Sequence, residues 1–174
     1  GYAARPELGG GVVLTLSHPL DYLRWFLGEV NSIWGLTSHM GLNMPVEDLA
    51  EIGLGFANGA IGSLHLDYDQ RPPSHTLEII GTRGTIRWDN TDGITKLAVV
   101  GQDNKVSPWR EFIPPEGFER NHMFLDELRH SFCGHRQYFW YRSLGRLGFS
   151  LFRLFGRPFS KIFVIRVHLF ASTQ

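Results

Sequence analysis

The 174 residues of this chain, of which 43% are hydrophobic and 20% are charged, suffice for one hydrophobic core and argue against disorder and coiled coil. The 17 basic and 17 acidic residues cancel, but residues 1–134 carry 10 − 17 = −7 charges and residues 135–174 carry +7. No stretch of about 18 apolar residues lacks a charge, so no transmembrane helix is predicted.

The first predicted element is a helix over about residues 10–27, which begins in a run of three glycines. Its apolar residues recur at steps of three and four, as one face of an α-helix requires. These residues are Val13, Leu16, Leu20, Leu23 and Leu27. Pro19 has no N–H to donate to the carbonyl of Thr15, so we expect either a kink or two short helices. Gly28 is placed to end the helix.

A β-hairpin is predicted next, because the apolar residues change to a period of two after Val30. Residues 50–56 alternate apolar side chains with Glu or Gly, and residues 64–68 form the returning strand. Asn58 and Gly59 between them are the residues that tight hairpin turns prefer.

A second hairpin is predicted from residues 77–80 to residues 85–88, with Gly-Thr-Arg-Gly at positions 81–84 as its turn. Weaker strand patterns follow near residues 97–100 and 110–113. Together these four to six strands predict a largely antiparallel sheet.

A last helix is predicted over about residues 122–132, with Asn121 as a candidate N-cap. Helix, strands and helix in this order indicate the α+β class, in which an open, mostly antiparallel sheet has its helices on one face. A face without helices predicts self-association through that face into a homo-oligomer.

Four stretches of this sequence resemble the Gfo/Idh/MocA family, the relatives of glucose-fructose oxidoreductase and inositol dehydrogenase. The glycine run followed by Ser-His-Pro-Leu-Asp-Tyr-Leu-Arg-Trp at positions 17–25 resembles the signature helix of the family. Residues 56–63, 78–86 and 118–121 resemble its hairpins and closing helix, in the family's order. The resemblance covers about residues 7–133.

The resemblance implies a substrate and oligomerisation domain, here residues 1–134, whose partner in the family is an N-terminal Rossmann domain that holds NAD or NADP. We find no such Rossmann domain in this sequence. The glycines from Gly53 to Gly59 have the wrong spacing for a dinucleotide fingerprint and fall in a strand and a turn. The family's Glu-Lys-Pro segment, with its catalytic lysine, also has no counterpart, so this chain alone is expected to be inactive.

The resemblance makes His18 the candidate catalytic residue. Oxidation of a secondary alcohol needs a proton acceptor near neutral pH, which an imidazole provides. Many relatives have an aspartate one helical turn earlier, where this chain has Thr15. A hydroxyl can donate to the ring or to a sugar, but it cannot stabilise an imidazolium by charge. Without the resemblance, His18 would be interpreted as a residue of a helix turn before Pro19.

Four further residues are candidates for substrate binding, and each has a structural alternative. Asp21 could orient His18 or only favour the first turn of the helix. Tyr22 could form an apolar wall for a sugar ring, although aromatic residues on such a helix usually belong to the core. Arg71 and His75 flank a proline-containing loop that could meet a sugar or a nucleotide phosphate, or that could be a solvated connection.

A metal site is a further possibility that the sequence raises, because His122, Asp126 and His130 follow one another at steps of four. These positions oppose the apolar stripe of their predicted helix. We therefore interpret them as an exposed polar face and predict no metal.

Residues 135–174 form an atypical tail with no Asp or Glu, ten aromatic residues and seven basic ones. About residues 138–157 could form a basic amphipathic helix for a membrane surface, and basic residues among aromatics could bind nucleic acid. We favour a third interpretation, a frameshift or truncated gene product without a selected function. Neither nucleic acid nor a membrane is therefore expected as a partner.

The sequence thus predicts a fragment of an NAD(P)-dependent oxidoreductase that acts on a secondary hydroxyl of a sugar, cyclitol or sugar nucleotide. The alternative is a non-catalytic sugar-binding or oligomerisation module, and a tail-driven peripheral membrane module is a third hypothesis. One cysteine, Cys133, and a start without a charged-then-apolar leader predict a reducing, cytoplasmic location.

Overall fold

The structure is a computed structural model that describes residues 1–114 and 162–170. Nearly all of these residues belong to one compact unit, formed by residues 1–111 and 161–174. The helix predicted over residues 122–132 and the possible amphipathic helix over residues 138–157 lie outside the described residues.

The N-terminal segment folds as two 3₁₀ turns, Tyr2–Ala4 and Pro6–Leu8, followed by two α-helices, α1 (Val12–Thr15) and α2 (His18–Leu27). The helix predicted over residues 10–27 is therefore present as two short helices. Pro19 lies in the first turn of α2, where its missing N–H leaves no helical hydrogen bond unmade. Gly28 ends the helix at a φ of 85°, as predicted, and its N–H donates to the carbonyl of Arg24 at 2.7 Å.

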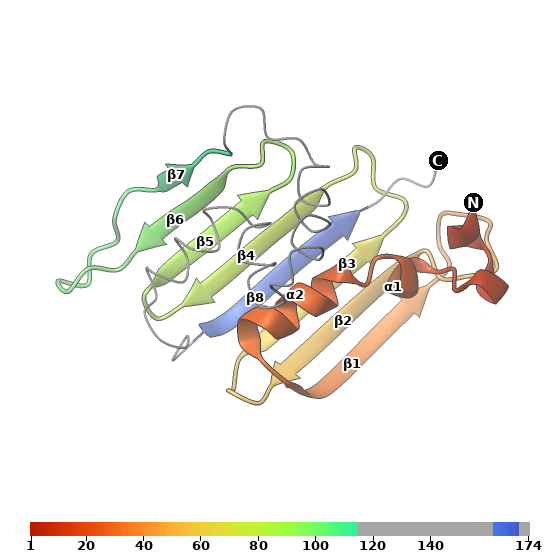
Figure 1. The fold of residues 1–174 in the computed structure, drawn as a ribbon, viewed down its shortest axis with the longest axis horizontal. Helices are drawn as coiled ribbons and strands as arrows, with labels where there is room; N and C mark the ends of the chain where they lie inside the picture. The colour runs from red at the N-terminus through yellow and green to blue at the C-terminus, as the bar shows by residue number, and fades with distance from the viewer. Residues whose placement is uncertain (115–161, 171–174) are drawn as a thin grey trace, which may run out of the picture. The chain divides into compact units, whose positions relative to one another are not determined.

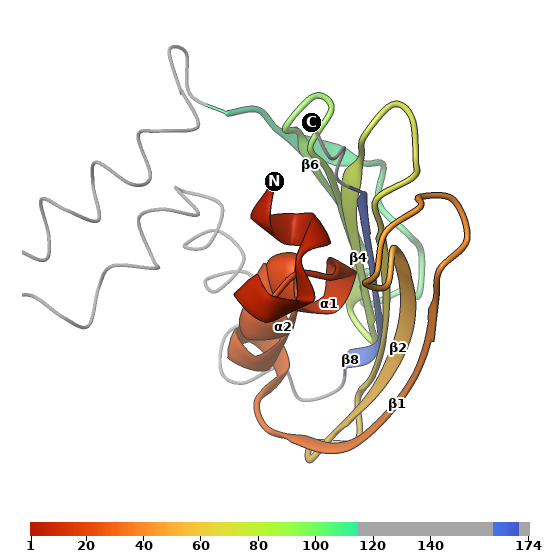
Figure 2. The ribbon, with the colours of Figure 1, turned by 90° about the vertical axis from the view of Figure 1, so that its right-hand side faces the viewer.

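Among the described residues, eight strands form one open sheet in the order β1-β2-β3-β8-β4-β5-β6-β7 (Figure 1). The strands are β1 (Val30–Ser38), β2 (Leu49–Phe56), β3 (Ile61–Asp67), β4 (His75–Gly81), β5 (Gly84–Asp89), β6 (Thr95–Val99), β7 (Arg110–Phe112) and β8 (Ile162–Phe170). Only the β3–β8 pair is parallel among the registered pairs of described strands. Figure 2 shows α1 and α2 on one face of this sheet. The predicted fold class, α+β with a mostly antiparallel open sheet and helices on one face, is confirmed.

Two of the described strands were not predicted. The sequence predicts four to six strands, and the described residues form eight. β1 occupies an edge, and β8 lies in the middle of the sheet between β3 and β4. The residues of β8 come from the stretch that the sequence assigned to an atypical tail. Val167 of β8 is fully buried while Arg166 and His168 beside it are exposed, which is the alternation of a strand with one covered face.

The hydrophobic core lies on the sheet face that the helices cover. Leu64 of β3, Val167 of β8 and Leu77 of β4 stand directly opposite one another in register, and the first two are completely buried. From the helices, Val12, Leu23 and Leu27 are buried over this face. Leu16, Leu23 and Leu27 are the buried members of the predicted apolar stripe, and with Val12 they attach the helices to the sheet.

The first hairpin turns through three residues rather than two. The N–H of Gly59 donates to the carbonyl of Phe56, and Gly59 has a φ of 87°. A glycine after a type I turn supplies this left-handed conformation without strain. The Asn58 side chain accepts from the N–H of Ala60 and donates to the carbonyl of Leu27, both at 3.0 Å. Asn58 thus joins this turn to the end of α2.

Replacing Asn58 with alanine is expected to lower the free energy of unfolding by about 1–2 kcal/mol, because both part-buried hydrogen bonds are lost. Urea denaturation followed by circular dichroism measures this difference. The exposed Asn43 is the matched control, and Asn43→Ala should change stability by less than about 0.5 kcal/mol. Equal losses in the two variants would show that Asn58 does not link the turn to α2.

Candidate active site

Three of the six predicted site residues meet between α2 and the start of β4. His18 is the first residue of α2, Tyr22 lies one turn later, and His75 is the first residue of β4. The hydroxyl of Tyr22 lies 2.9 Å from Nε2 of His75, and the two rings stack with their centroids 6.0 Å apart. The ring of His18 meets that of His75 edge-on at 5.7 Å. The structure therefore brings two imidazoles and a phenol together.

Trp88 of β5 completes this cluster and was not predicted. Its ring packs edge-on against His75, with the centroids 4.9 Å apart. Register pairs Trp88 with Leu77, which is two residues from His75 on the same side of β4. The alternation of Ile86 and Trp88 in the sequence was the available signal, because it places both side chains on the helix-covered face.

Two groups near His75, the Tyr22 phenol and the Asp89 carboxyl, have shifted pKa values. Burial raises the pKa of the Tyr22 phenol, so its hydroxyl stays protonated across the physiological range. The pKa of Asp89 is lowered, chiefly because the Thr91 hydroxyl and N–H donate to its carboxylate, with a smaller contribution from the charge of His75. Asp89 is therefore a carboxylate within electrostatic range of the imidazole.

Replacing Tyr22 with phenylalanine is expected to cost about 1 kcal/mol of stability, the usual contribution of one hydrogen bond. The ring ¹⁵N and ¹H resonances of His75 should also move, since Nε2 loses its partner. Urea denaturation and imidazole NMR spectra measure the two effects. Tyr2→Phe, at a side chain that is 61% exposed, should alter neither quantity. Unchanged His75 resonances in Tyr22→Phe would contradict the assigned contact.

Thr15 is held away from His18 by a different set of partners. Its hydroxyl donates to the carbonyl of Gly11 at 2.7 Å and contacts the hydroxyl of Tyr68. Tyr68 is buried, which raises its pKa, and its hydroxyl also donates to Gly11 at 3.0 Å. No hydrogen bond joins Thr15 to His18 in the described part of the chain. Thr15 therefore anchors α1 to the end of β3, and it does not replace the relatives' acid next to the histidine.

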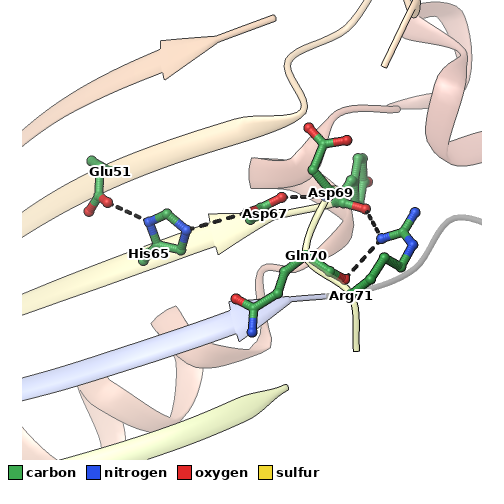
Figure 3. A network of polar contacts seen from close by, with 7 residues as sticks. Glu51, His65, Asp67, Asp69, Gln70 and Arg71 are labelled. Atoms are coloured by element: carbon green, nitrogen blue, oxygen red, sulfur yellow. Dashed lines mark hydrogen bonds and ion pairs between the residues drawn. The ribbon is translucent and has the colours of Figure 1, made fainter. Parts of the chain in front are cut away.

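Asp21 and Arg71 do not join the cluster either. Asp21 is exposed on α2, and within residues 1–114 no hydrogen bond or ion pair links it to His18. The Arg71 guanidinium donates to the carbonyls of Tyr68 at 2.8 Å and Gln70 at 2.9 Å (Figure 3). These bonds fold the arginine back onto its own loop. Burial, together with the nearby Asp48 and Asp67 carboxylates, raises the pKa of Asp69, and Arg71 partly offsets that rise.

The sheet face without helices carries a row of polar side chains. Glu51, His65 and His168 are directly opposite one another across β2, β3 and β8. Nδ1 of His65 contacts the Glu51 carboxylate, and Nε2 lies 3.7 Å from Asp67 (Figure 3). The two acids thus flank the His65 ring, and the His168 ring lies beside it with the centroids 5.8 Å apart. Within residues 1–114 and 162–170, no three His, Cys, Asp or Glu side chains are placed so that they could hold a metal ion, and His122, Asp126 and His130 lie outside those ranges.

The glycines whose spacing could suggest a dinucleotide fingerprint lie inside a strand. Gly53 and Gly55 lie within β2, where the Trp34 indole covers the first and the Ser32 hydroxyl covers the second. A Cβ at either position would collide with these neighbours, so the glycines permit close packing between β1 and β2. A phosphate-binding loop instead needs free N–H groups at the start of a helix. Gly53 and Gly55 therefore have a packing role within the sheet and do not form such a loop.

Comparison with known proteins identifies the domain. Residues 2–87 match the GFO/IDH/MocA C-terminal domain. Residues 2–87 thus form a GFO/IDH/MocA C-terminal domain. The resemblance of the signature helix and the two hairpins is thereby confirmed, and the matched residues include α1, α2 and β1 to β4. No curated protein sequence matches the chain.

Solved structures of the GFO/IDH/MocA type share the fold. Levoglucosan dehydrogenase in complex with NADH is 21% identical with a TM-score of 0.57, and the match covers 66% of this chain and 34% of that one. The inositol dehydrogenase homolog of Azotobacter vinelandii with NAD+ is 18% identical with a TM-score of 0.55, and the match covers 67% of this chain and 31% of that one. The WlbA dehydrogenase of Bordetella pertussis with NADH and UDP-GlcNAcA is 24% identical with a TM-score of 0.50, and the match covers 72% of this chain and 36% of that one. The matched part of the chain thus spans about a third of each of these proteins. No helix among the described residues is long and apolar enough to cross a membrane.

Proposed function

We propose that this chain is the substrate domain, over residues 1–134, of an NAD(P)-dependent oxidoreductase acting on a secondary hydroxyl of a sugar, cyclitol or sugar nucleotide. The observation that carries the proposal is the cluster of His18, Tyr22, His75 and Trp88 at the start of the family's signature helix. Levoglucosan, inositol and a UDP-sugar in the names of similar structures support the substrate class.

His18 is the proton acceptor in this proposal. When hydride leaves the carbon of a secondary alcohol, the hydroxyl proton must pass to a base, and an exposed imidazole can accept it. NAD or NADP would supply the hydride acceptor, and a further domain would hold it, as the family resemblance implies. His75 and Trp88 form the wall beside His18 against which a sugar ring can pack.

The remaining predicted contacts have weaker support in the geometry. Tyr22 acts through His75, since its part-buried hydroxyl is hydrogen-bonded to that ring. Asp21 stays a prediction as an exposed residue of α2 that a substrate could reach. Thr15 and Arg71 are engaged with backbone carbonyls, so we propose supporting rather than substrate-binding roles for them.

Binding of sugars to this chain tests the proposal without the cofactor. In NMR titrations with levoglucosan, myo-inositol and a UDP-sugar, at least one ligand should move the His18, His75 and Trp88 resonances together. His75→Phe should weaken that binding at least fivefold, while His39→Phe, at an exposed histidine elsewhere, should leave it unchanged. Shifts confined to other residues, or none with any ligand, would remove the substrate site from this cluster.

A non-catalytic sugar-binding module remains the second candidate, because Thr15 makes its bonds to Gly11 and Tyr68, and within residues 1–114 no hydrogen bond or ion pair joins Asp21 to His18. The two functions differ in one measurement. If the chain is part of an oxidoreductase, a protein that joins it to a dinucleotide-binding domain should reduce NAD or NADP while it oxidises the bound sugar. Sugar binding without turnover would support the module instead.

We also propose a homo-oligomer that forms through the helix-free face of the sheet. This face carries the polar row of Glu51, His65 and His168 together with the ion pair between Arg87 and Glu78 at 2.7 Å. The charged side chains of this face would contribute to the interface, so the association should weaken as salt screens their charges. Sedimentation equilibrium at low and high salt tests this, and a monomer at both would contradict it.

A further inference from the structure

β1 is an edge strand whose outer side has no neighbouring strand among those the structure describes. It runs for nine residues, Val30–Ser38, and pairs antiparallel with β2 alone. Figure 1 shows it at the border of the sheet. Its backbone therefore presents a row of N–H and C=O groups to which another strand can bind.

Apolar side chains are exposed on both faces of this strand. Ile33 stands opposite Leu54, on the face that the helices cover further along the sheet, and is 66% exposed. Trp34 and Leu36 point to the helix-free face and are 61% and 70% exposed. The helices thus leave the edge of the core face open at β1.

The usual protections of an edge strand are almost absent from β1. Residues 30–38 contain no charged side chain and no proline. The register shifts only between Val30 and Ser32, and it then runs regularly to Ser38. Natural edge strands carry lysines, prolines or bulges because these prevent pairing with a second chain. The regular part of β1 is therefore built to accept a strand.

The position of the apolar side chains determines the kind of partner. A surface stacked on the helix-free face would cover Trp34 and Leu36 but would leave Ile33 in water. A strand added at the edge extends both faces of the sheet, so it covers all three.

The sequence of β1 complements itself across a two-fold axis. In an antiparallel pair centred on Gly35, Trp34 lies beside the partner's Leu36, and Leu36 lies beside the partner's Trp34. Aromatic and aliphatic side chains directly opposite each other stabilise antiparallel strands. Because the strand is uncharged, two identical copies meet without repulsion. We propose that β1 pairs antiparallel with β1 of a second copy of this chain, centred on Gly35, to give one continuous sheet.

This association is independent of the proposed activity and of stacking through the helix-free face. A single strand pair buries less than the roughly 1,200 Å² of a standard stable interface, so we expect a weak, concentration-dependent dimer. Since no charge takes part, added salt should not weaken it. That behaviour separates edge pairing from association through the polar face.

A disulfide at the two-fold axis tests the geometry directly. Gly35 would lie opposite the partner's Gly35, where Cα atoms of antiparallel strands are about 4.5–5.5 Å apart, a separation that a disulfide spans. A Cβ at Gly35 fits, because its nearest neighbour is the Glu51 carbonyl oxygen at 3.5 Å. In full-length chain with Cys133→Ser, Gly35→Cys should give a covalent dimer under mild oxidation. Thr37→Cys, on the same strand but away from the axis, should cross-link at least tenfold less.

Sedimentation equilibrium distinguishes pairing through the β1 edge from association through the helix-free face. The same substitution, isoleucine to lysine, is made once at the edge and once on that face. Ile33 and Ile61 are 66% and 56% exposed, but Ile33 lies on β1 and Ile61 lies on β3, on the helix-free face. Ile33→Lys should weaken the dimer at least tenfold, whereas Ile61→Lys should leave it unchanged. Thr37→Lys, at an exposed polar position of β1, serves if Ile33→Lys fails to fold.

Three results would overturn the proposal. A chain that stays monomeric at every concentration has no such dimer. Loss of the dimer in Ile61→Lys but not in Ile33→Lys or Thr37→Lys would assign it to the helix-free face. Equal cross-linking of Gly35→Cys and Thr37→Cys would show that the strands do not meet about Gly35.

Discussion

Replacing Asp48 with asparagine is expected to lower the free energy of unfolding by about 3–5 kcal/mol at neutral pH. Asp48 is completely buried at the end of the loop that joins β1 to β2. Its carboxylate accepts the N–H groups of Met40, Gly41 and Leu42 at distances between 2.9 and 3.1 Å. Asparagine has the same shape, but its amide would turn a donor towards these donors or leave some of them unpaired.

The effect of Asp48 should depend on pH in a defined direction. Burial alone would raise the pKa of Asp48, but the N–H groups of Leu42, Met40 and Gly41 outweigh it and hold the pKa below its ordinary value. A carboxyl with a lowered pKa in the folded state stabilises the protein above its unfolded pKa, near 3.9. This contribution is lost as the pH falls through the lower, folded value. The difference between the wild type and Asp48→Asn should therefore be full at pH 7 and shrink below about pH 4.

Urea denaturation at several pH values measures both predictions. Asp103→Asn is the matched control, because Asp103 is exposed and pairs only with the nearby Lys105 among described side chains. It should change stability by less than about 1 kcal/mol. A loss in Asp48→Asn that is as small as the control's, or that grows as the solution becomes acidic, would disprove the role given to the carboxylate.

Local patterns in the sequence were sufficient for the elements whose partners are close along the chain. The break near Pro19, the end of α2 at Gly28 and the hairpin at Gly59 each follow from the backbone chemistry of one residue. The antiparallel hairpins also fix their own register through their turns. The fold class and the family could therefore be predicted before the structure.

The two missed strands needed information from distant parts of the chain. β8 pairs with β3 and β4, which lie about a hundred residues earlier. Its alternation around Val167 was present in the sequence, but the absence of acids and the many aromatic residues in the same stretch favoured a tail without function. β1 lacks the alternation of a half-buried strand, because both its faces are exposed.

The candidate site shows the same limit. His18 was identified from the helix on which it lies, and His75 from its loop, but only the packing of α2 on the sheet brings the two rings to 5.7 Å. The partners of Thr15 and the neighbour of His75 could not be derived locally, since Tyr68 and Trp88 belong to other strands. Residue type and position thus made His18 and His75 candidates, while the contacts of these side chains depended on the tertiary fold.

The remaining prediction concerns the proposed chemistry and has the largest expected effect. In a protein that joins this chain to a dinucleotide-binding domain, His18→Asn should lower kcat by about 10²- to 10⁴-fold, the usual contribution of a general base. The substitution should leave KM within about threefold, because the wall formed by His75 and Trp88 stays in place. In the wild type, kcat should fall at acidic pH because the base becomes protonated. His18→Asn should remove this acidic limb of the pH–rate profile. Steady-state kinetics of NAD(P) reduction with the sugar that binds measures all three quantities.

The matched comparison is His75→Asn, because the two imidazoles are neighbours but only His18 is proposed to accept the proton. His75→Asn should raise KM more than it lowers kcat and should keep the acidic limb, as expected for a residue that contacts the substrate. His18 is exposed at the start of α2, so its loss should not unfold the domain, and circular dichroism checks this. If both variants lose kcat equally and keep the limb, the proton passes to another group, and His18 serves only to position the substrate.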